Sequence, residues 1–226
     1  MTVIKICGLT NLEDARWAAQ CGADLLGFIF VPSSPRYVTP DKVAEITANL
    51  ADEGCRARFV GVFADEPAES VRRIASTCSL HLAQLHGHET PEYAYELGLP
   101  PNGVIGGLPP NGVIGGLPVI VARRVRGAIP WEELSCFCPW AYLLDGYDPQ
   151  RLGGTGQPWP WELLAEGGQR LERVILAGGL TPLNVGEALL RASPWGVDVS
   201  TGVEASPGHK DPAKVERFIR RVKEAL

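Results

Sequence analysis

Short apolar segments rich in Val, Ile and Leu alternate eight times with amphipathic segments along the 226 residues of this chain. Segments that are apolar along most of their length are typical of strands covered on both faces, as in parallel sheets. We expect eight strands, at Val3–Ile6, Leu25–Phe30, Phe59–Phe63, Leu80–Leu85, Val119–Ala122, Tyr142–Leu144, Val174–Ala177 and Gly196–Val199. The expected helices or helical turns that follow them are Leu12–Cys21, Pro40–Asp52, Pro67–Ser76, Pro91–Leu97, Trp131–Leu134, Trp161–Ala165, Pro182–Arg191 and Pro212–Leu226.

This regular alternation predicts an α/β fold in which helices cross over between neighbouring parallel strands. Eight units at this chain length favour a closed (β/α)₈ TIM barrel over an open sheet. Apart from one repeat, no low-complexity segment divides the chain, so we expect a single domain over residues 1–226.

Composition and charge argue against nucleic-acid and membrane partners. The net charge is −5 and no basic run is present, so we expect no nucleic-acid partner. The N-terminus lacks the features of a signal peptide, and no apolar stretch approaches the roughly 20 residues of a membrane span. We therefore expect a cytoplasmic protein without a membrane partner, present as a monomer, with a homodimer as the alternative.

The cysteines and histidines do not have the spacing of a metal site. The six cysteines form no C-x-x-C pair, and Cys136 and Cys138 are too close together for a zinc knuckle. No H-E-x-x-H motif is present, and His86 and His88 are only two residues apart. We expect no metal.

In (β/α)₈ barrels the chemistry lies at the C-terminal ends of the strands, often with a phosphate bound between the loops after strands seven and eight. Glycines and hydroxyl residues follow both of these strands, and they suit a phosphate because backbone N–H groups can approach it closely. The candidate phosphate-binding residues are Gly178, Gly179, Ser200, Thr201 and Gly202.

Other strand ends carry groups suited to proton transfer. Cys7 ends the first strand and can act as a base or nucleophile when it is a thiolate. Asp145 ends the sixth strand and is a candidate acid. Arg36, in a proline-bounded loop, can clamp a carboxylate through two parallel hydrogen bonds. The glycine-rich segment Gly153–Gly156, which includes Gly154, can close over a ligand.

Several motifs together resemble the phosphoribosylanthranilate isomerase family. They are KICGLT, GFIFVPSSPRYV, VGVF, QLHG, LLDG followed by GGTG and W, ILAGGL, and VDVSTGVEASPGHKD, in the family's order over nearly the whole chain. The resemblance implies a (β/α)₈ barrel that carries out an Amadori rearrangement in L-tryptophan biosynthesis, without a cofactor. It also implies that Cys7 is the general base, that Asp145 is the general acid, and that Arg36 holds the anthranilate carboxylate.

The implied substrate is a phosphorylated aminosugar, N-(5-phosphoribosyl)anthranilate, and the implied product is 1-(o-carboxyphenylamino)-1-deoxyribulose 5-phosphate. The phosphate and the carboxylate of this substrate match the two anion sites predicted from the residues, which are the loops after strands seven and eight and Arg36. Gln84, His86 and Asp198 match family positions that line the site, and Gly154 lies in the matching glycine-rich loop.

Two alternatives stay open at this point. The related isomerase of histidine biosynthesis is a phosphosugar barrel with similar phosphate loops, but it would carry an aspartate in place of Cys7. A catalytically inactive scaffold barrel is suggested only by the repeat, and the presence of Cys7, Asp145 and Arg36 argues against it.

The repeat is the nonapeptide PNGVIGGLP, which occurs at Pro101–Pro109 and again at Pro110–Pro118. It falls between the fourth helix and the fifth strand, and this connection belongs to the face of the barrel opposite the chemistry. Loop-closure entropy grows slowly with length, so an insertion here is tolerated. We predict that residues 101–118 are a tandem insertion that is neutral for catalysis.

Overall fold

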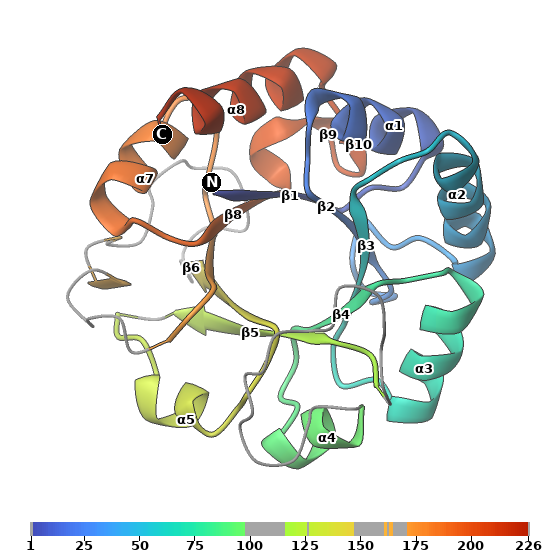
Figure 1. The fold of residues 1–226 in the computed structure, drawn as a ribbon, viewed down its shortest axis with the longest axis vertical. Helices are drawn as coiled ribbons and strands as arrows, with labels where there is room; N and C mark the ends of the chain where they lie inside the picture. The colour runs from blue at the N-terminus through green and yellow to red at the C-terminus, as the bar shows by residue number, and fades with distance from the viewer. Residues whose placement is uncertain are drawn as a thin grey trace.

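A computed structural model of the chain describes residues 2–97, 116–125, 127–146, 161, 163–164 and 171–225. Eight parallel strands form a closed barrel in chain order, and helices surround it (Figure 1). The strands are β1 Val3–Cys7, β2 Leu25–Ile29, β3 Arg58–Phe63, β4 Leu82–Leu85, β5 Val119–Val125, β6 Ala141–Gly146, β7 Val174–Ala177 and β8 Gly196–Val199. The predicted (β/α)₈ barrel is confirmed.

The helices follow the predicted positions closely. They are α1 Leu12–Cys21, α2 Pro40–Asp52, α3 Ala68–Thr77, α4 Pro91–Glu96, α5 Trp131–Ser135, α7 Val185–Ala192 and α8 Pro212–Glu224. Of the helix expected over residues 161–165, residues 162 and 165 lie outside the described residues, and its extent stays a prediction. No helix within the described parts of the chain is long and apolar enough to cross a membrane.

Side-chain oxygens set several helix starts. Asn11 accepts a hydrogen bond from the Asp14 backbone N–H at 2.8 Å and so caps α1. Asp211 caps α8 in the same way, accepting from the N–H groups of residues 213 and 214. α7 begins three residues later than predicted, because the Asn184 side chain accepts from the Thr181 N–H and holds the preceding residues in a turn.

The core is divided into two layers by the barrel wall. The larger cluster lies between the strands and the helices and includes Ile4 and Ile6 of β1. The smaller cluster fills the barrel interior, and Val3 packs against it. Because side chains alternate along a strand, Lys5 and Cys7 point into the barrel with Val3.

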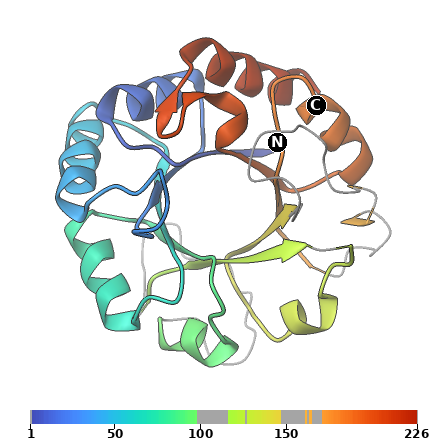
Figure 2. The ribbon, with the colours of Figure 1, turned by 180° about the vertical axis from the view of Figure 1, so that it is seen from behind.

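A short hairpin after β8 was not predicted. The 3₁₀ turn η1 (Thr201–Val203) leads into β9 (Glu204–Ser206), which pairs with β10 (His209–Lys210) in an antiparallel sheet. Seen from behind, these elements lie inside the ring of helices, beside α1 and α8 (Figure 2). They bring Glu204 and Lys210 to the C-terminal side of β8.

The doubled nonapeptide lies mostly outside the described residues, which resume at Gly116. The chain returns close to its point of departure, since the Leu117 N–H donates to the Leu97 carbonyl at 3.0 Å. The insertion itself stays a prediction.

We predict that deletion of residues 101–118 leaves the fold and the turnover intact. In the unchanged chain the tripeptide Gly-Leu-Pro at Gly116–Pro118 precedes β5. After the deletion the identical tripeptide at Gly98–Pro100 takes its place. Each halving of a loop lowers its closure cost by about 0.6 kcal/mol, so thermal stability should not fall. Circular dichroism melting, and assays of the isomerase activity that the resemblance implies, check the prediction on this variant and on a variant lacking only residues 101–109. Lost turnover in a folded variant would contradict it.

Candidate functional site

The loops after β7 and β8 pack directly against each other at the mouth of the barrel. Gly178 and Gly179 follow β7, and η1 follows β8. A methyl group at Gly202 would collide with the Leu180 carbonyl oxygen, so only glycine permits this approach. The structure therefore brings the five predicted phosphate-binding residues, which come from these two loops, to one edge of the mouth.

Cys7 lies at the mouth end of β1, where Gly27 of β2 is its partner in the sheet. The thiol is buried, with 5% of the residue exposed. A methyl group at Gly27 would lie 2.8 Å from Cys7 Sγ and 3.1 Å from Lys5 Nζ. The missing side chain at Gly27 thus leaves room for the sulfur and the ammonium.

Lys5 is fully buried and pairs with Asp198, whose Oδ1 lies 2.9 Å from Lys5 Nζ. The two residues are also partners in the β1–β8 pairing that closes the barrel. Burial opposes the charge on Lys5, but the neighbouring Asp198 and Cys7 raise the pKa of Lys5 above its ordinary value. The predicted site residue Asp198 is therefore paired with a buried cation, the Lys5 ammonium.

Arg36 meets Glu204 through one edge of its guanidinium group. Nε donates at 2.7 Å and Nη2 at 2.6 Å to the two carboxylate oxygens. Nη2 also lies 3.4 Å from Thr201 Oγ1. Lys210 donates to Glu204 Oε1 at 2.9 Å and to the Ser200 carbonyl at 3.3 Å. This network ties the predicted carboxylate clamp to the predicted phosphate loop.

Asp145 lies at the mouth end of β6, on the other side of the barrel from β1 and β2. Its Oδ2 is 3.5 Å from His86 Nε2. Gln84 Nε2 lies 3.0 Å from His86 Nδ1. The two ring nitrogens of His86 thus face Gln84 on one side and Asp145 on the other. The three predicted residues therefore lie side by side at the mouth, with the His86 ring between Gln84 and Asp145.

Three buried polar atoms of the predicted site residues have no hydrogen-bond partner in the described parts of the chain. Among the described residues, Gln84 Oε1, His86 Nε2 and Ser200 Oγ are buried and have no hydrogen-bond partner. Buried polar atoms are normally paired, so these three are suited to a polar ligand. Gly154 lies outside the described residues, and its predicted role stays a prediction.

The sequence reasoning missed Lys5 and Lys210 and gave Glu204 no role of its own. One signal for Lys5 was available: a lysine in the middle of the apolar strand VIKIC, two residues before Cys7 and therefore on the same face. Glu204 and Lys210 belong to the VDVSTGVEASPGHKD motif, but only the hairpin β9–β10 shows that they pair.

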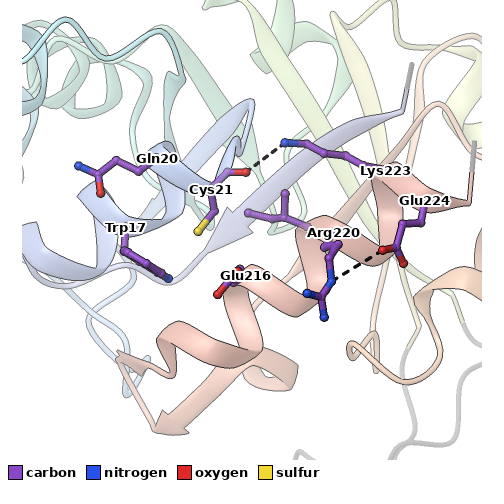
Figure 3. Close-up of a pocket in the computed structure, with 8 residues that line it drawn as sticks. Trp17, Gln20, Cys21, Glu216, Arg220, Lys223 and Glu224 are labelled. Carbon is purple, nitrogen blue, oxygen red and sulfur yellow. Dashed lines mark hydrogen bonds and ion pairs between the residues drawn. The ribbon is translucent and has the colours of Figure 1, made fainter.

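Two hollows lie away from the barrel mouth. One, of about 450 Å³, is on the outer surface between α1 and α8, and it is lined by residues such as Trp17, Cys21 and Arg220 (Figure 3). The other, of about 730 Å³, is at the opposite end of the barrel and is lined by residues that include Arg58, Trp140 and Arg173. Neither contains a predicted site residue.

The fold and the site define a (β/α)₈ barrel whose mouth combines cationic groups with a buried thiol and a carboxylate. Residues 4–102 and 132–221 match the family model described as N-(5'-phosphoribosyl)anthranilate (PRA) isomerase. The chain belongs to the N-(5'-phosphoribosyl)anthranilate isomerase family, a family of enzymes of the isomerase class. This confirms the resemblance seen in the motifs.

Individual relatives agree with the family match over their full length. The N-(5'-phosphoribosyl)anthranilate isomerase of Trichlorobacter lovleyi is 42% identical over 226 residues, which is 100% of both chains. The crystal structure of phosphoribosyl anthranilate isomerase from Thermotoga maritima superposes with a TM-score of 0.82 at 34% identity, covering 99% of this chain and 100% of that one. A phosphoribosyl anthranilate isomerase in complex with reduced 1-(o-carboxyphenylamino)-1-deoxyribulose 5-phosphate has a TM-score of 0.78 at 33% identity, with the same coverage.

We predict that Glu204→Gln lowers the free energy of unfolding at pH 7 by about 3 kcal/mol, because it leaves the buried Lys210 without its carboxylate. Burial raises the pKa of Glu204, but the lowering by Arg36 and Lys210 is larger in sum. The pKa of Glu204 therefore lies below its ordinary value. A lowered carboxylate pKa stabilises the fold above the unfolded-state pKa of about 4.3, and this stability is lost as the pH falls through the folded-state pKa.

The stability difference between Glu204→Gln and the unchanged chain should therefore narrow as the pH drops below about 4.3. Urea titrations followed by circular dichroism at a series of pH values measure it. Glu53→Gln, at the exposed Arg16–Glu53 pair, is the matched control and should change little. Equal stability of the Glu204→Gln variant and the unchanged chain at pH 7 would contradict the prediction.

Proposed function

We propose that this chain converts N-(5'-phosphoribosyl)anthranilate into 1-(o-carboxyphenylamino)-1-deoxyribulose 5-phosphate, in L-tryptophan biosynthesis. The observation that carries the proposal is the placement of Cys7 and Asp145 at the mouth ends of β1 and β6 of a barrel of this family. A proton-abstracting group and a proton-donating group then face one substrate from two sides.

Two anion sites hold the ends of the substrate. The phosphate binds to the loops after β7 and β8, at Gly178, Gly179, Ser200, Thr201 and Gly202. The anthranilate carboxylate binds to Arg36. Glu204 occupies the Nε–Nη2 edge of this guanidinium, and among the described residues Nη1 has no partner, so it is available for the carboxylate.

The reaction proceeds by general acid–base catalysis. Asp145 donates a proton to the furanose ring oxygen, and the ring opens to a protonated imine. The Cys7 thiolate then removes the proton from C2′, and the resulting enolamine tautomerises to the ketone. Gln84, His86 and Asp198 line the site, Gly154 belongs to a loop that closes over the substrate, and no cofactor takes part.

We predict that Cys7→Ser and Asp145→Asn each lower turnover by about 10²–10⁴-fold, because each removes one proton-transfer group. The assay follows the loss of anthranilate-type fluorescence when N-(5'-phosphoribosyl)anthranilate is added. Circular dichroism confirms that each variant is folded.

The exposed Cys138 provides the control. Cys138→Ser makes the same chemical change away from the mouth and should leave turnover unchanged. Full activity of Cys7→Ser or of Asp145→Asn would contradict the assigned role of that residue.

A parallel assay with the aminoaldose of the histidine pathway separates the two phosphosugar isomerases, since both use similar phosphate loops. Turnover of that substrate alone would overturn the proposal, and turnover of neither substrate would favour the inactive scaffold. We also propose a cytoplasmic monomer. Sedimentation equilibrium tests this against the homodimer.

A further inference from the structure

Lys5 is a buried cation that the proposed reaction does not use. None of its surface is exposed. Removing an ammonium ion from water costs several kcal/mol even in real proteins, so an apolar residue would fill the same interior space at lower cost. A lysine in this position despite this cost points to a role for its charge.

The strand register brings this charge to the Cys7 sulfur. In the β1–β2 pairing Lys5 lies beside Leu25 and Cys7 lies beside Gly27. The Lys5 side chain extends along the barrel axis toward Cys7, and its ammonium group lies in the space left free by Gly27. Sγ and Nζ both lie within about 3 Å of the point that a Gly27 methyl group would occupy, so they are within about 6 Å of each other.

The charges facing Cys7 come from four parts of the fold. Lys5 is on β1, Asp198 on β8, Lys210 on β10 and Arg36 in the loop after β2. Glu204 is held between Arg36 and Lys210. Among these described groups three cations face two carboxylates, and a thiolate at Cys7 would balance the remaining positive charge.

We propose that Lys5 is a positioning residue whose charge favours the thiolate form of Cys7, and that Asp198 in turn holds the Lys5 ammonium in place. The proposal rests on the proposed function for the use of the thiolate. In that step the C2′–H bond breaks, the proton moves to sulfur, the bonding electrons form the C1′–C2′ double bond, and the imine nitrogen takes up the electron pair. Lys5 stays protonated throughout.

The influences on the pKa of Cys7 agree with this geometry. Burial raises the pKa of the Cys7 thiol above its ordinary value, the Lys5 charge lowers it, and the Asp198 charge raises it. The two neighbours therefore act on the sulfur in opposite directions. Removing either of them should move the Cys7 titration in the direction that its charge dictates.

The test is a titration of the Cys7 thiolate without substrate. It is read from ultraviolet thiolate absorbance as the difference between each chain and the same chain carrying Cys7→Ser, which removes the signal of the other five cysteines. Lys5→Met should raise the pKa of Cys7, and a thiol whose pKa lies above 7 loses about tenfold in thiolate fraction at pH 7 when that pKa rises by one. Asp198→Asn should lower the pKa.

Lys42→Met is the matched control, because Lys42 is exposed on α2, pairs with Glu45 and is not among the charges that act on Cys7. If Lys5→Met alone does not fold, the double variant Lys5→Met/Asp198→Asn removes both charges of the pair. The double variant should titrate at higher pH than Asp198→Asn. Unchanged titration in a folded Lys5→Met, or a double variant that titrates like Asp198→Asn, would overturn the inference.

Kinetics distinguish this role from a purely structural one. In Lys5→Met the acidic limb of the kcat/KM profile should move to higher pH and kcat should fall at neutral pH, while KM changes little. A kcat/KM profile that keeps its position on the pH axis would also overturn the inference. A Lys5-dependent thiolate in a chain that does not turn over N-(5'-phosphoribosyl)anthranilate would support it while contradicting the proposed function.

Discussion

The pairing of β1 with β8 is the interaction on which the rest of the structure depends. Four residues of β1, from Val3 to Ile6, pair in parallel with four residues of β8, from Gly196 to Val199. This pairing leaves no free sheet edge and joins residues that are almost the whole chain apart. The same register makes Lys5 and Asp198 neighbours, so the closure of the barrel and the ion pair beneath the mouth arise from one set of contacts.

The barrel and the positions of the site residues were predictable, because each follows from local pattern. Apolar segments alternating with capped helices indicate the units, and in a parallel barrel the residue after each strand lies at the mouth. Cys7 and Asp145 could be selected in this way without knowing which strands are neighbours. The start of α7 was misplaced, because Asn184 and Thr181 form a turn where Pro182 had suggested the first helical residue.

The ion pairs were not predictable, because they depend on contacts between distant residues. Lys5 and Asp198 are 193 positions apart, and Arg36 and Glu204 are 168 apart. A lysine within an apolar strand is conspicuous, but its partner is known only once the register is known. The hairpin β9–β10 is equally hard to foresee, since strands of three and two residues carry no periodic signal.

The two sides of the mouth differ in a way that suits opposite proton-transfer roles. On the β1 side the thiol is buried among charges that come from separate elements, so these charges act on its ionisation with little screening by water. On the β6 side the Asp145 side chain is 30% exposed and is linked through His86 to Gln84. A proposed acid must regain a proton after each turnover, and contact with solvent provides one. The closed barrel therefore sets the buried thiol of the proposed base opposite the partly exposed carboxylate of the proposed acid.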